Sequence, residues 1–142
     1  MSNPRIIRGS CLCAGVRYRI TGPVGEISHC HCSMCRKAHG AAFATYAPVR
    51  RGDFEWLDGE SLVRGYPSSP GIERTFCERC GSTLQFIKRD DPEYVELALG
   101  TLDDDPGVRP ALHIWVDSMA PWDAITDRLP CHREDPPDEV GG

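Results

Sequence analysis

Cysteine is the residue type through which this chain is best equipped to do chemistry. Seven of its eight cysteines fall into three short groups, Cys11-Leu12-Cys13, Cys30-His31-Cys32-Ser33-Met34-Cys35 and Cys77-Glu78-Arg79-Cys80, and Cys131 stands alone. In a reducing cytosol, clustered cysteines are more often metal ligands than disulfides. The grouping therefore predicts two zinc ions, bound by seven cysteines.

One zinc is expected to hold the fold together. Cys77-x-x-Cys80-Gly81 has the spacing of a zinc knuckle, in which Gly81 tolerates a backbone conformation that bulkier residues resist. The pair Cys11 and Cys13 can reach one ion only if the chain bends there, because alternate side chains of a flat strand point to opposite faces. Two sulfurs from each pair would make a closed four-thiolate site, and closed sites are structural.

The remaining cysteines, Cys30, Cys32 and Cys35, form a local three-thiolate set. Three protein ligands leave one position open, which is the pattern of a reactive zinc. The fourth ligand is expected to be water, a substrate thiol or a side chain, with His29, His31, His39 and Cys131 as the candidate side chains.

Charge limits what such a centre can do. Zinc with three thiolates already carries a charge of about −1, so it suits soft ligands such as thiols better than it activates water. Arg36 and Lys37 directly follow the last cysteine of this set and are candidates to offset that charge.

Spacing alone leaves two other arrangements open. Cys77 and Cys80 can instead join the set of three, which would leave Cys11 and Cys13 reduced. Alternatively, the cysteines bind one metal ion only.

The elements around these groups are predicted to be mainly β. Short runs with strand character are separated by turn signals containing Gly and Pro, which favours an all-β sandwich or partly open barrel. The expected strands are 16–20, 42–47, 62–66, 72–76, 83–87, 94–99 and 112–116. Short helical turns are expected at 33–39, ended by Gly40, and at 121–126. His113 and Trp115 alternate on a predicted strand and are expected to pack in the core, with a role in lining a pocket as the alternative.

Length indicates how many domains the chain forms, and charge limits the kinds of partner that it can bind. The 142 residues suit one compact domain, predicted over 1–133, followed by a disordered acidic tail over 134–142. The net charge is −5 and the basic residues form no long run, which argues against nucleic acid or an anionic membrane as partner. No stretch approaches 18 apolar residues, and residues 1–10 lack the apolar core of a signal peptide, so a cytoplasmic location is expected.

The sequence resembles a known family at several of these motifs. The matching segments are Gly9-Ser10-Cys11-Leu12-Cys13-Ala14-Gly15-Val16-Arg17-Tyr18, Cys30-His31-Cys32-Ser33-Met34-Cys35-Arg36-Lys37, Phe76-Cys77-Glu78-Arg79-Cys80-Gly81-Ser82, Pro110-Ala111-Leu112-His113-Ile114-Trp115 and Ala120-Pro121-Trp122-Asp123. They are similar to the glutathione-dependent formaldehyde-activating enzyme family, which also includes centromere protein V-like proteins. One departure is that Ala14 stands between Cys13 and Gly15, where the family usually has Gly directly after the cysteine, and this predicts a slight shift of the turn.

The resemblance implies a fold, a ligand set and a reaction. It implies packed antiparallel β-sheets with two zincs per chain. It assigns Cys11, Cys13, Cys77 and Cys80 to the structural zinc, and Cys30, Cys32 and Cys35 to the zinc where the reaction occurs. The family reaction joins formaldehyde and glutathione into S-hydroxymethylglutathione and belongs with the carbon–sulfur lyases. A small thiol and an aldehyde are the implied partners, and Arg36 and Lys37 become candidates for contacts to glutathione.

Three functions are weighed on this basis. The first is a zinc-dependent carbon–sulfur lyase, which requires a cleft beside Cys30, Cys32 and Cys35. The second is a non-catalytic zinc-binding interaction module, which requires an exposed apolar or basic face. The third is a redox or metal-buffering protein that uses the same thiolates.

Overall fold

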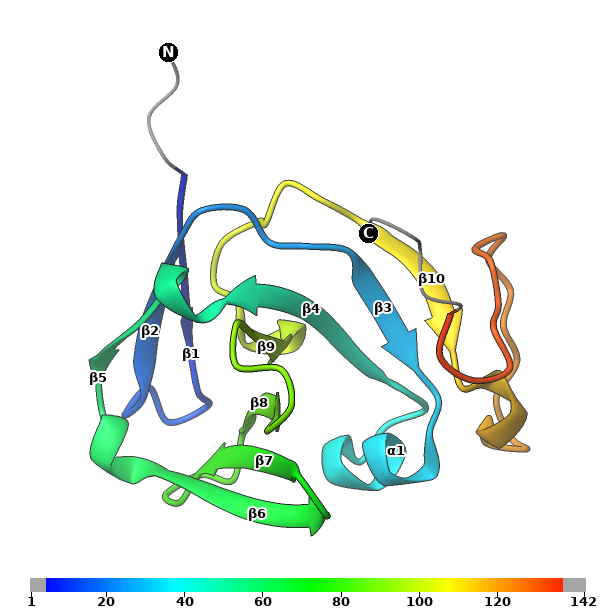
Figure 1. Cartoon of the computed structure of the whole chain (residues 1–142), viewed down its shortest axis with the longest axis horizontal. Helices are drawn as coiled ribbons and strands as arrows, with labels where there is room; N and C mark the ends of the chain where they lie inside the picture. The colour runs from blue at the N-terminus through cyan, green and yellow to red at the C-terminus, as the bar shows by residue number, and fades with distance from the viewer. Residues whose placement is uncertain (1–4, 137–142) are drawn as a thin grey trace.

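Two β-sheets make up most of the structure (Figure 1), which is a computed structural model that describes residues 5–136. The larger sheet has seven strands in the order β10 (Pro110–Ile114), β3 (Ile27–Cys30), β4 (Ala44–Arg50), β9 (Tyr94–Ala98), β8 (Thr83–Lys88), β7 (Ile72–Cys77) and β6 (Val63–Ser69). The smaller sheet has three strands in the order β1 (Ile6–Ser10), β2 (Arg17–Thr21) and β5 (Phe54–Asp58). The chain is therefore a single, mainly β domain, as the sequence predicts.

Strand direction departs from the expected antiparallel pairing at one edge of the large sheet. Every other pair of neighbouring strands is antiparallel, but β10 pairs with β3 in parallel, with His113 opposite His29 and Ile114 opposite Cys30. Antiparallel neighbours can be joined by tight turns, whereas a parallel pair needs a long connection. Here more than half of the chain lies between β3 and β10, so the pairing joins the first and last strands of this sheet.

Each of the seven expected strands overlaps an observed one, with ends that differ by up to three residues. The sequence reasoning missed three others, β1, β3 and β5. Within β3, Ser28 and His29 separate the buried ends Ile27 and Cys30, so the segment shows no regular alternation of apolar and polar residues. These three strands are short and are fixed by pairing with their neighbours, which local sequence does not reveal.

Between residues 5 and 136, helical structure is limited to short segments. The α-helix α1 spans Ser33–His39, and Gly40 ends it in the left-handed conformation with φ of 59°, which confirms the predicted helix and its C-cap. Four 3₁₀ turns lie at Arg51–Asp53, Glu60–Leu62, Leu99–Thr101 and Val116–Ser118. The helix expected over 121–126 was wrong. Only one turn forms there, closed by the Asp123 amide bonding to the Ala120 carbonyl, and Trp122 is 72% exposed, so this segment has no apolar face to bury.

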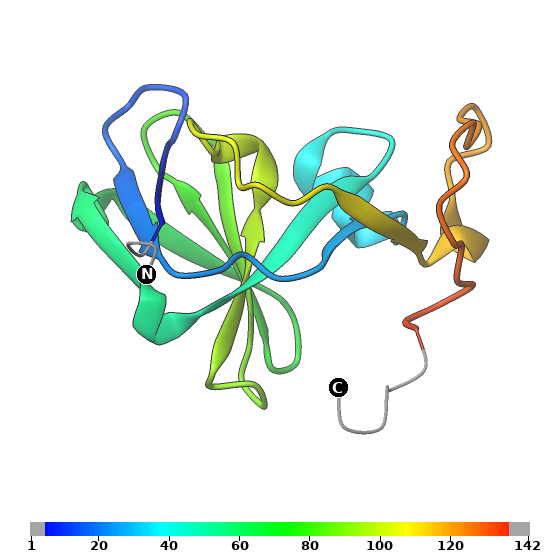
Figure 2. The same ribbon diagram turned by 90° about the horizontal axis from the view of Figure 1, so that it is seen from above.

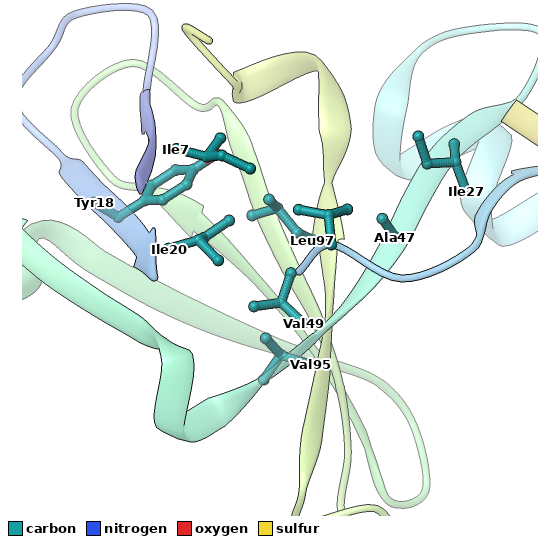
Figure 3. Close-up of a cluster of buried hydrophobic side chains, with 9 residues drawn as sticks. Ile7, Tyr18, Ile20, Ile27, Ala47, Val49, Val95 and Leu97 are labelled. Carbon is teal, nitrogen blue, oxygen red and sulfur yellow. The ribbon is translucent and has the colours of Figure 1, made fainter. Parts of the chain in front are cut away.

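The main core lies between the two sheets (Figure 3). Ile7, Tyr18 and Ile20 from the small sheet pack against Ala47, Val49, Val95 and Leu97 from the large one, together with Val24 and Ile27. All nine side chains are at most 5% exposed. Their burial fixes one face of the large sheet against the small sheet and leaves its other face free to form a site.

After β10 the chain loops out and then returns to lie beside that strand in the same direction (Figure 2). The His113 amide bonds to the Pro130 carbonyl, the His132 amide bonds to the His113 carbonyl, and Cys131 forms a parallel bridge with His113. Glu134 and Asp135 belong to this segment, and residues 137–142 of the expected tail lie outside the described residues. Across residues 5–136, the structure contains no helix with the length and apolar character that crossing a membrane demands.

Candidate metal centres

Two turns that are far apart in the sequence meet at the end of the small sheet. Cys11 and Cys13 lie in the turn between β1 and β2, and Cys77 and Cys80 lie at the turn between β7 and β8. The first turn belongs to the small sheet and the second to the large one, so a metal ion bound by both turns would tie the two sheets together.

The four sulfurs of these turns, from Cys11, Cys13, Cys77 and Cys80, form a compact group, which we call the four-cysteine cluster. All four lie within 4.8 Å of one another, and the separations are 3.5 Å for Cys11 to Cys13 and 3.9 Å for Cys13 to Cys77. Sulfurs placed about 2.3 Å from a tetrahedral zinc lie about 3.8 Å apart. The donor set and its spacing therefore fit a zinc ion, and of the alternative pairings the structure favours Cys77 and Cys80 with Cys11 and Cys13.

Backbone conformation in both turns directs the sulfurs inward. Gly81 has φ of 82°, and its amide bonds to the Cys77 carbonyl at 2.7 Å, which confirms the expected role of this glycine. In the other turn Ala14 takes the left-handed conformation with φ of 62°. This is the conformation that glycine adopts at least cost, so Ala14 accommodates the turn in spite of its side chain.

Hydrogen-bond donors surround the cluster. The amides of Gly15 and Val16 donate to the sulfurs of Cys13 and Cys11 at 3.4 and 3.3 Å. Ser82 accepts a bond from the Leu12 amide, which leaves its hydroxyl free to donate to the Cys80 sulfur at 3.3 Å. This bond lowers the pKa of the Cys80 thiol to about 5. Such donors stabilise thiolate charge, which a zinc site requires.

Burial has the opposite effect on the pKa of the Cys77 thiol. This side chain is fully buried, and desolvation raises its pKa to about 11. A buried sulfur of this kind becomes a thiolate at neutral pH only with a cation beside it.

Cys30, Cys32 and Cys35 lie together at the other end of the large sheet. Cys30 is the last residue of β3, Cys32 is the N-cap of α1, and Cys35 is the buried residue of that helix. Cys30 and Cys35 belong to one buried cluster of side chains, and both are at most 5% exposed. Cys32 is half-buried. Within residues 5–136, the four-cysteine cluster is the only group of three or more ligand residues whose atoms all lie within 4.8 Å of one another, so the three sulfurs of Cys30, Cys32 and Cys35 do not all come that close.

All three cysteines line one cavity of about 420 Å³. The cavity opens on the face of the large sheet away from the main core, and its wall also includes Tyr46, Arg74, Phe86, Glu96, Ile114 and Trp115. A larger hollow of about 640 Å³ lies at the turn between β6 and β7, but its lining contains neither cysteine nor histidine. The smaller cavity therefore holds the reactive groups, and we call it the thiol cavity.

Arg74 supplies the positive charge beside these thiols. Both of its Nη atoms lie 3.7 Å from the Cys35 sulfur, Nη1 donates to the Tyr46 hydroxyl at 2.9 Å, and the side chain is 8% exposed. The interaction with the neighbouring Cys30 thiol and the charge of Arg74 lower the pKa of the Cys35 thiol to about 6, whereas the interaction with Cys35, together with burial, raises the pKa of Cys30. One thiolate and one thiol therefore share the buried end of the cavity.

Further contacts fix the orientation of Arg74. Its Nε donates to the Ser68 hydroxyl at 3.0 Å, and its guanidinium lies 4.8 Å from the centre of the Phe86 ring. The Tyr46 hydroxyl, which accepts from Arg74, is 3.0 Å from His39 Nε2. Burial and the nearby Arg74 lower the pKa of His39 to about 4, so this ring is neutral and accepts a hydrogen bond from the Tyr46 hydroxyl.

The basic pair singled out from the sequence lies elsewhere. Arg36 donates from Nε to the His31 carbonyl at 3.4 Å, and neither Arg36 nor Lys37 is in the wall of the thiol cavity. Their role toward glutathione or toward the charge of the site stays a prediction. The sequence reasoning missed Arg74, although a charged residue between the buried positions of β7 is a signal of internal pairing.

The candidate side chains for a fourth ligand have other partners. His29 Nδ1 pairs with the Thr45 hydroxyl at 2.8 Å, His39 pairs with Tyr46, and the exposed Cys131 sulfur lies 3.6 Å from the Leu129 carbonyl. His31 Nε2 is 2.8 Å from Nδ1 of His113.

A hydrogen-bonded chain of side chains supports the loop between Cys30 and Cys32. Asp127 lies 2.9 Å from His113 Nε2 and only accepts when ionised, so His113 donates to it and accepts from His31 through Nδ1. His31 and His113 are at most 2% exposed, and Nδ1 of His31 has no hydrogen-bond partner among the described residues. His113 thus packs in the core as expected, whereas Trp115 lies beyond the strand with φ of 58° and lines the thiol cavity.

Comparison with known proteins agrees with this arrangement. Residues 6–118 match the family model described as glutathione-dependent formaldehyde-activating enzyme. The chain is 32% identical over 133 residues to a Halomonas elongata protein named "Putative glutathione-dependent formaldehyde-activating enzyme", an alignment that spans 87% of this chain and 83% of that protein. It is 31% identical over 78 residues to a Schizosaccharomyces pombe protein named "Uncharacterized lyase", with 55% of each chain covered.

A solved structure shares the fold. A Rhodobacter sphaeroides protein of known crystal structure superposes with a TM-score of 0.58 at 25% sequence identity, covering 72% of this chain and 91% of that one. The family match spans both turns of the four-cysteine cluster and all three cysteines of the thiol cavity. This chain therefore belongs to the glutathione-dependent formaldehyde-activating enzyme family.

Proposed function

We propose that this protein is a zinc-dependent carbon–sulfur lyase that forms or cleaves the adduct of a thiol with an aldehyde, with S-hydroxymethylglutathione from glutathione and formaldehyde as the family reaction. The observation that carries the proposal is that Cys30, Cys32 and Cys35 line one cavity with the buried Arg74 against the Cys35 sulfur. The names of the relatives from Halomonas elongata and Schizosaccharomyces pombe point to the same class of reaction.

The two centres would have different roles. Cys11, Cys13, Cys77 and Cys80 would hold a structural zinc, because four thiolates leave no position for a substrate. Cys30, Cys32 and Cys35 would hold a second zinc, for which three thiols beside one cavity are a chemically suitable donor set. A zinc ion bound there would take up the substrate thiol and keep it deprotonated.

The chain's own residues would prepare the cavity for that chemistry. The guanidinium of Arg74 offsets the negative charge that thiolates accumulate, and Tyr46 and Ser68 hold it in place. Phe86, Ile114 and Trp115 form an apolar wall, which limits the water that competes with a small carbonyl compound. In the overall reaction the thiol sulfur bonds to the carbonyl carbon, and the proton lost by the thiol ends on the new hydroxyl group.

Metal analysis together with a turnover assay tests the proposal. The purified protein is expected to contain two zinc ions per chain and to accelerate adduct formation from glutathione and ¹³C-formaldehyde, followed by exchange NMR against the uncatalysed rate. One zinc per chain would refute the second centre. Two zincs without acceleration for glutathione or small thiols would instead indicate a non-catalytic zinc-binding module.

Removing the charge of Arg74 is expected to weaken the second centre selectively. Arg74→Met keeps an apolar side chain against Phe86 but loses hydrogen bonds to a charged group, each worth about 1.5–3 kcal/mol, so zinc affinity at the thiol cavity should fall about tenfold to a hundredfold. Arg74→Lys keeps the charge, so its zinc affinity is expected to lie between those of the unmodified protein and Arg74→Met. A competition titration with a chelator measures the affinity.

The matched control is Arg50→Met, which removes an exposed arginine paired with Glu93. That variant should titrate like the unmodified protein. Equal zinc affinity in Arg74→Met and the unmodified protein would show that Arg74 does not stabilise the centre.

A further inference from the structure

Glu96 is a carboxylate without a partner inside the thiol cavity. It lies on β9, is only partly exposed, and belongs to the cavity wall. Among residues 5–136, no hydrogen bond or ion pair reaches its side chain, and Phe86 lies directly opposite it on β8. Burial, and to a smaller extent Asp91, raise its pKa to about 7. Burying a carboxylate without a partner costs free energy unless a cation or a hydrogen-bond donor pairs with it.

The strand register places Glu96 far from Cys30. Cys30 pairs with Ala44 on β4, whereas Glu96 pairs with Pro48 on the same strand. Two strand spacings and four residues along β4 separate the two Cα atoms by roughly 16 Å in a flat sheet, and the curvature of the large sheet (Figure 1) shortens this. Once both side chains extend into the cavity, the gap between sulfur and carboxylate is on the order of 10 Å. Glu96 is therefore too distant to exchange a proton directly with the Cys30 thiol.

The nearby cations leave Glu96 free for a ligand. Lys88 also lines the cavity and lowers the pKa of Glu96, yet its amino group forms no ion pair with Glu96 among the described residues. Arg74 is already engaged by Ser68, Tyr46 and the sulfur of Cys35. A group that satisfies the carboxylate must come from outside this part of the chain, and the chemistry that does so is a cation or a hydrogen-bond donor.

We infer that Glu96 determines specificity by binding a positively charged group of the substrate, so that the preferred thiol carries an ammonium on the order of 10 Å from its sulfur. The inference rests on the proposed function, since it places the sulfur of that thiol at Cys30, Cys32 and Cys35. Glu96 would orient the substrate from the far end of the cavity and take no part in bond formation. Lys88, beside it, would accommodate a carboxylate on the same substrate.

Three thiols of equal chain length test this role. 6-Amino-1-hexanethiol carries an ammonium, 6-mercapto-1-hexanol is uncharged, and 6-mercaptohexanoic acid carries a carboxylate. Binding of each to the zinc-loaded protein is measured by calorimetry, and KM with formaldehyde is measured for those that react. Glu96→Gln keeps the shape of the side chain, so it should raise Kd and KM for the amine about tenfold while leaving both values for the alcohol unchanged.

The control variant is Glu93→Gln, which alters an exposed glutamate paired with Arg50 and should change none of these values. If Glu96→Gln affects all three thiols equally, affects none, or if no thiol binds the unmodified protein, the specificity role is overturned. If the amine binds in a Glu96-dependent way but nothing reacts with formaldehyde, the specificity role stands and the proposed lyase activity fails. If thiols react without any dependence on Glu96, the activity stands and the specificity role fails.

Discussion

Cys77→Ser is expected to lose one zinc ion per chain and to leave the protein largely unfolded at room temperature. The four-cysteine cluster joins the β1–β2 turn to the β7–β8 turn, so the loss of its metal would release the two sheets from each other at this end. A structural zinc contributes on the order of 10 kcal/mol or more to folding. A domain of this size is typically stable by only about 5–15 kcal/mol in total. Zinc content and thermal unfolding followed by circular dichroism measure the two effects.

Two further variants separate metal loss from damage to the core. Cys77 is fully buried, so its replacement also disturbs packing, whereas Cys13 is exposed and Cys13→Ser removes a ligand with little loss of packing. Cys131→Ser changes an exposed cysteine outside both groups and should keep full stability and zinc content. A stable Cys13→Ser protein with unchanged zinc content would contradict a structural zinc at this site.

Cys35→Ser is expected to abolish activity while leaving the fold intact. A serine hydroxyl is not ionised at neutral pH, so the variant loses the thiolate that faces Arg74 at 3.7 Å and with it the second zinc. Metal ions supply several kcal/mol to reactions of this kind, so turnover should fall about a hundredfold or more. Because the four-cysteine cluster is untouched, the unfolding temperature should change by only a few degrees.

Zinc content distinguishes this result from general damage. Cys35→Ser should contain one zinc per chain, Cys32→Ser should behave in the same way, and Cys131→Ser should contain two. Full zinc content and full turnover in Cys35→Ser would mean that the reaction does not depend on the thiol cavity. Together with Cys77→Ser, the experiment assigns each zinc to its own set of cysteines.

The four-cysteine cluster was the part of the site that the sequence predicted best. Cys77-x-x-Cys80-Gly81 specifies a turn by itself, and the structure shows Gly81 at φ of 82° as that turn demands. A bent Cys11-x-Cys13 pair is likewise a local feature, with Ala14 at φ of 62° providing the bend. Short spacings of this kind depend on backbone geometry over a few residues, which local sequence encodes.

The wall of the thiol cavity could not be predicted in the same way. Tyr46, Arg74 and Glu96 lie on three different strands. At each of these positions, the alternation of side chains along the strand indicates only that the residue faces away from the main core. Whether such a face meets solvent or a cavity depends on α1 and the segment after β10. Arg36 and Lys37 were chosen because they are neighbours of Cys35 in sequence, but the cation against that sulfur comes from β7.

The sequence by itself therefore determined that the domain is mainly β, that α1 ends at Gly40, and which cysteines are available as metal ligands. The tertiary structure decided which turns share the four-cysteine cluster, that β10 joins β3 in parallel, and which charged side chains accompany the thiols of the cavity. The physical reason is the distance along the sequence over which each interaction acts. Turn conformation and alternation arise between neighbouring residues, whereas Arg74 meets Cys35 and Glu96 enters the same cavity only after seven strands have paired into one sheet.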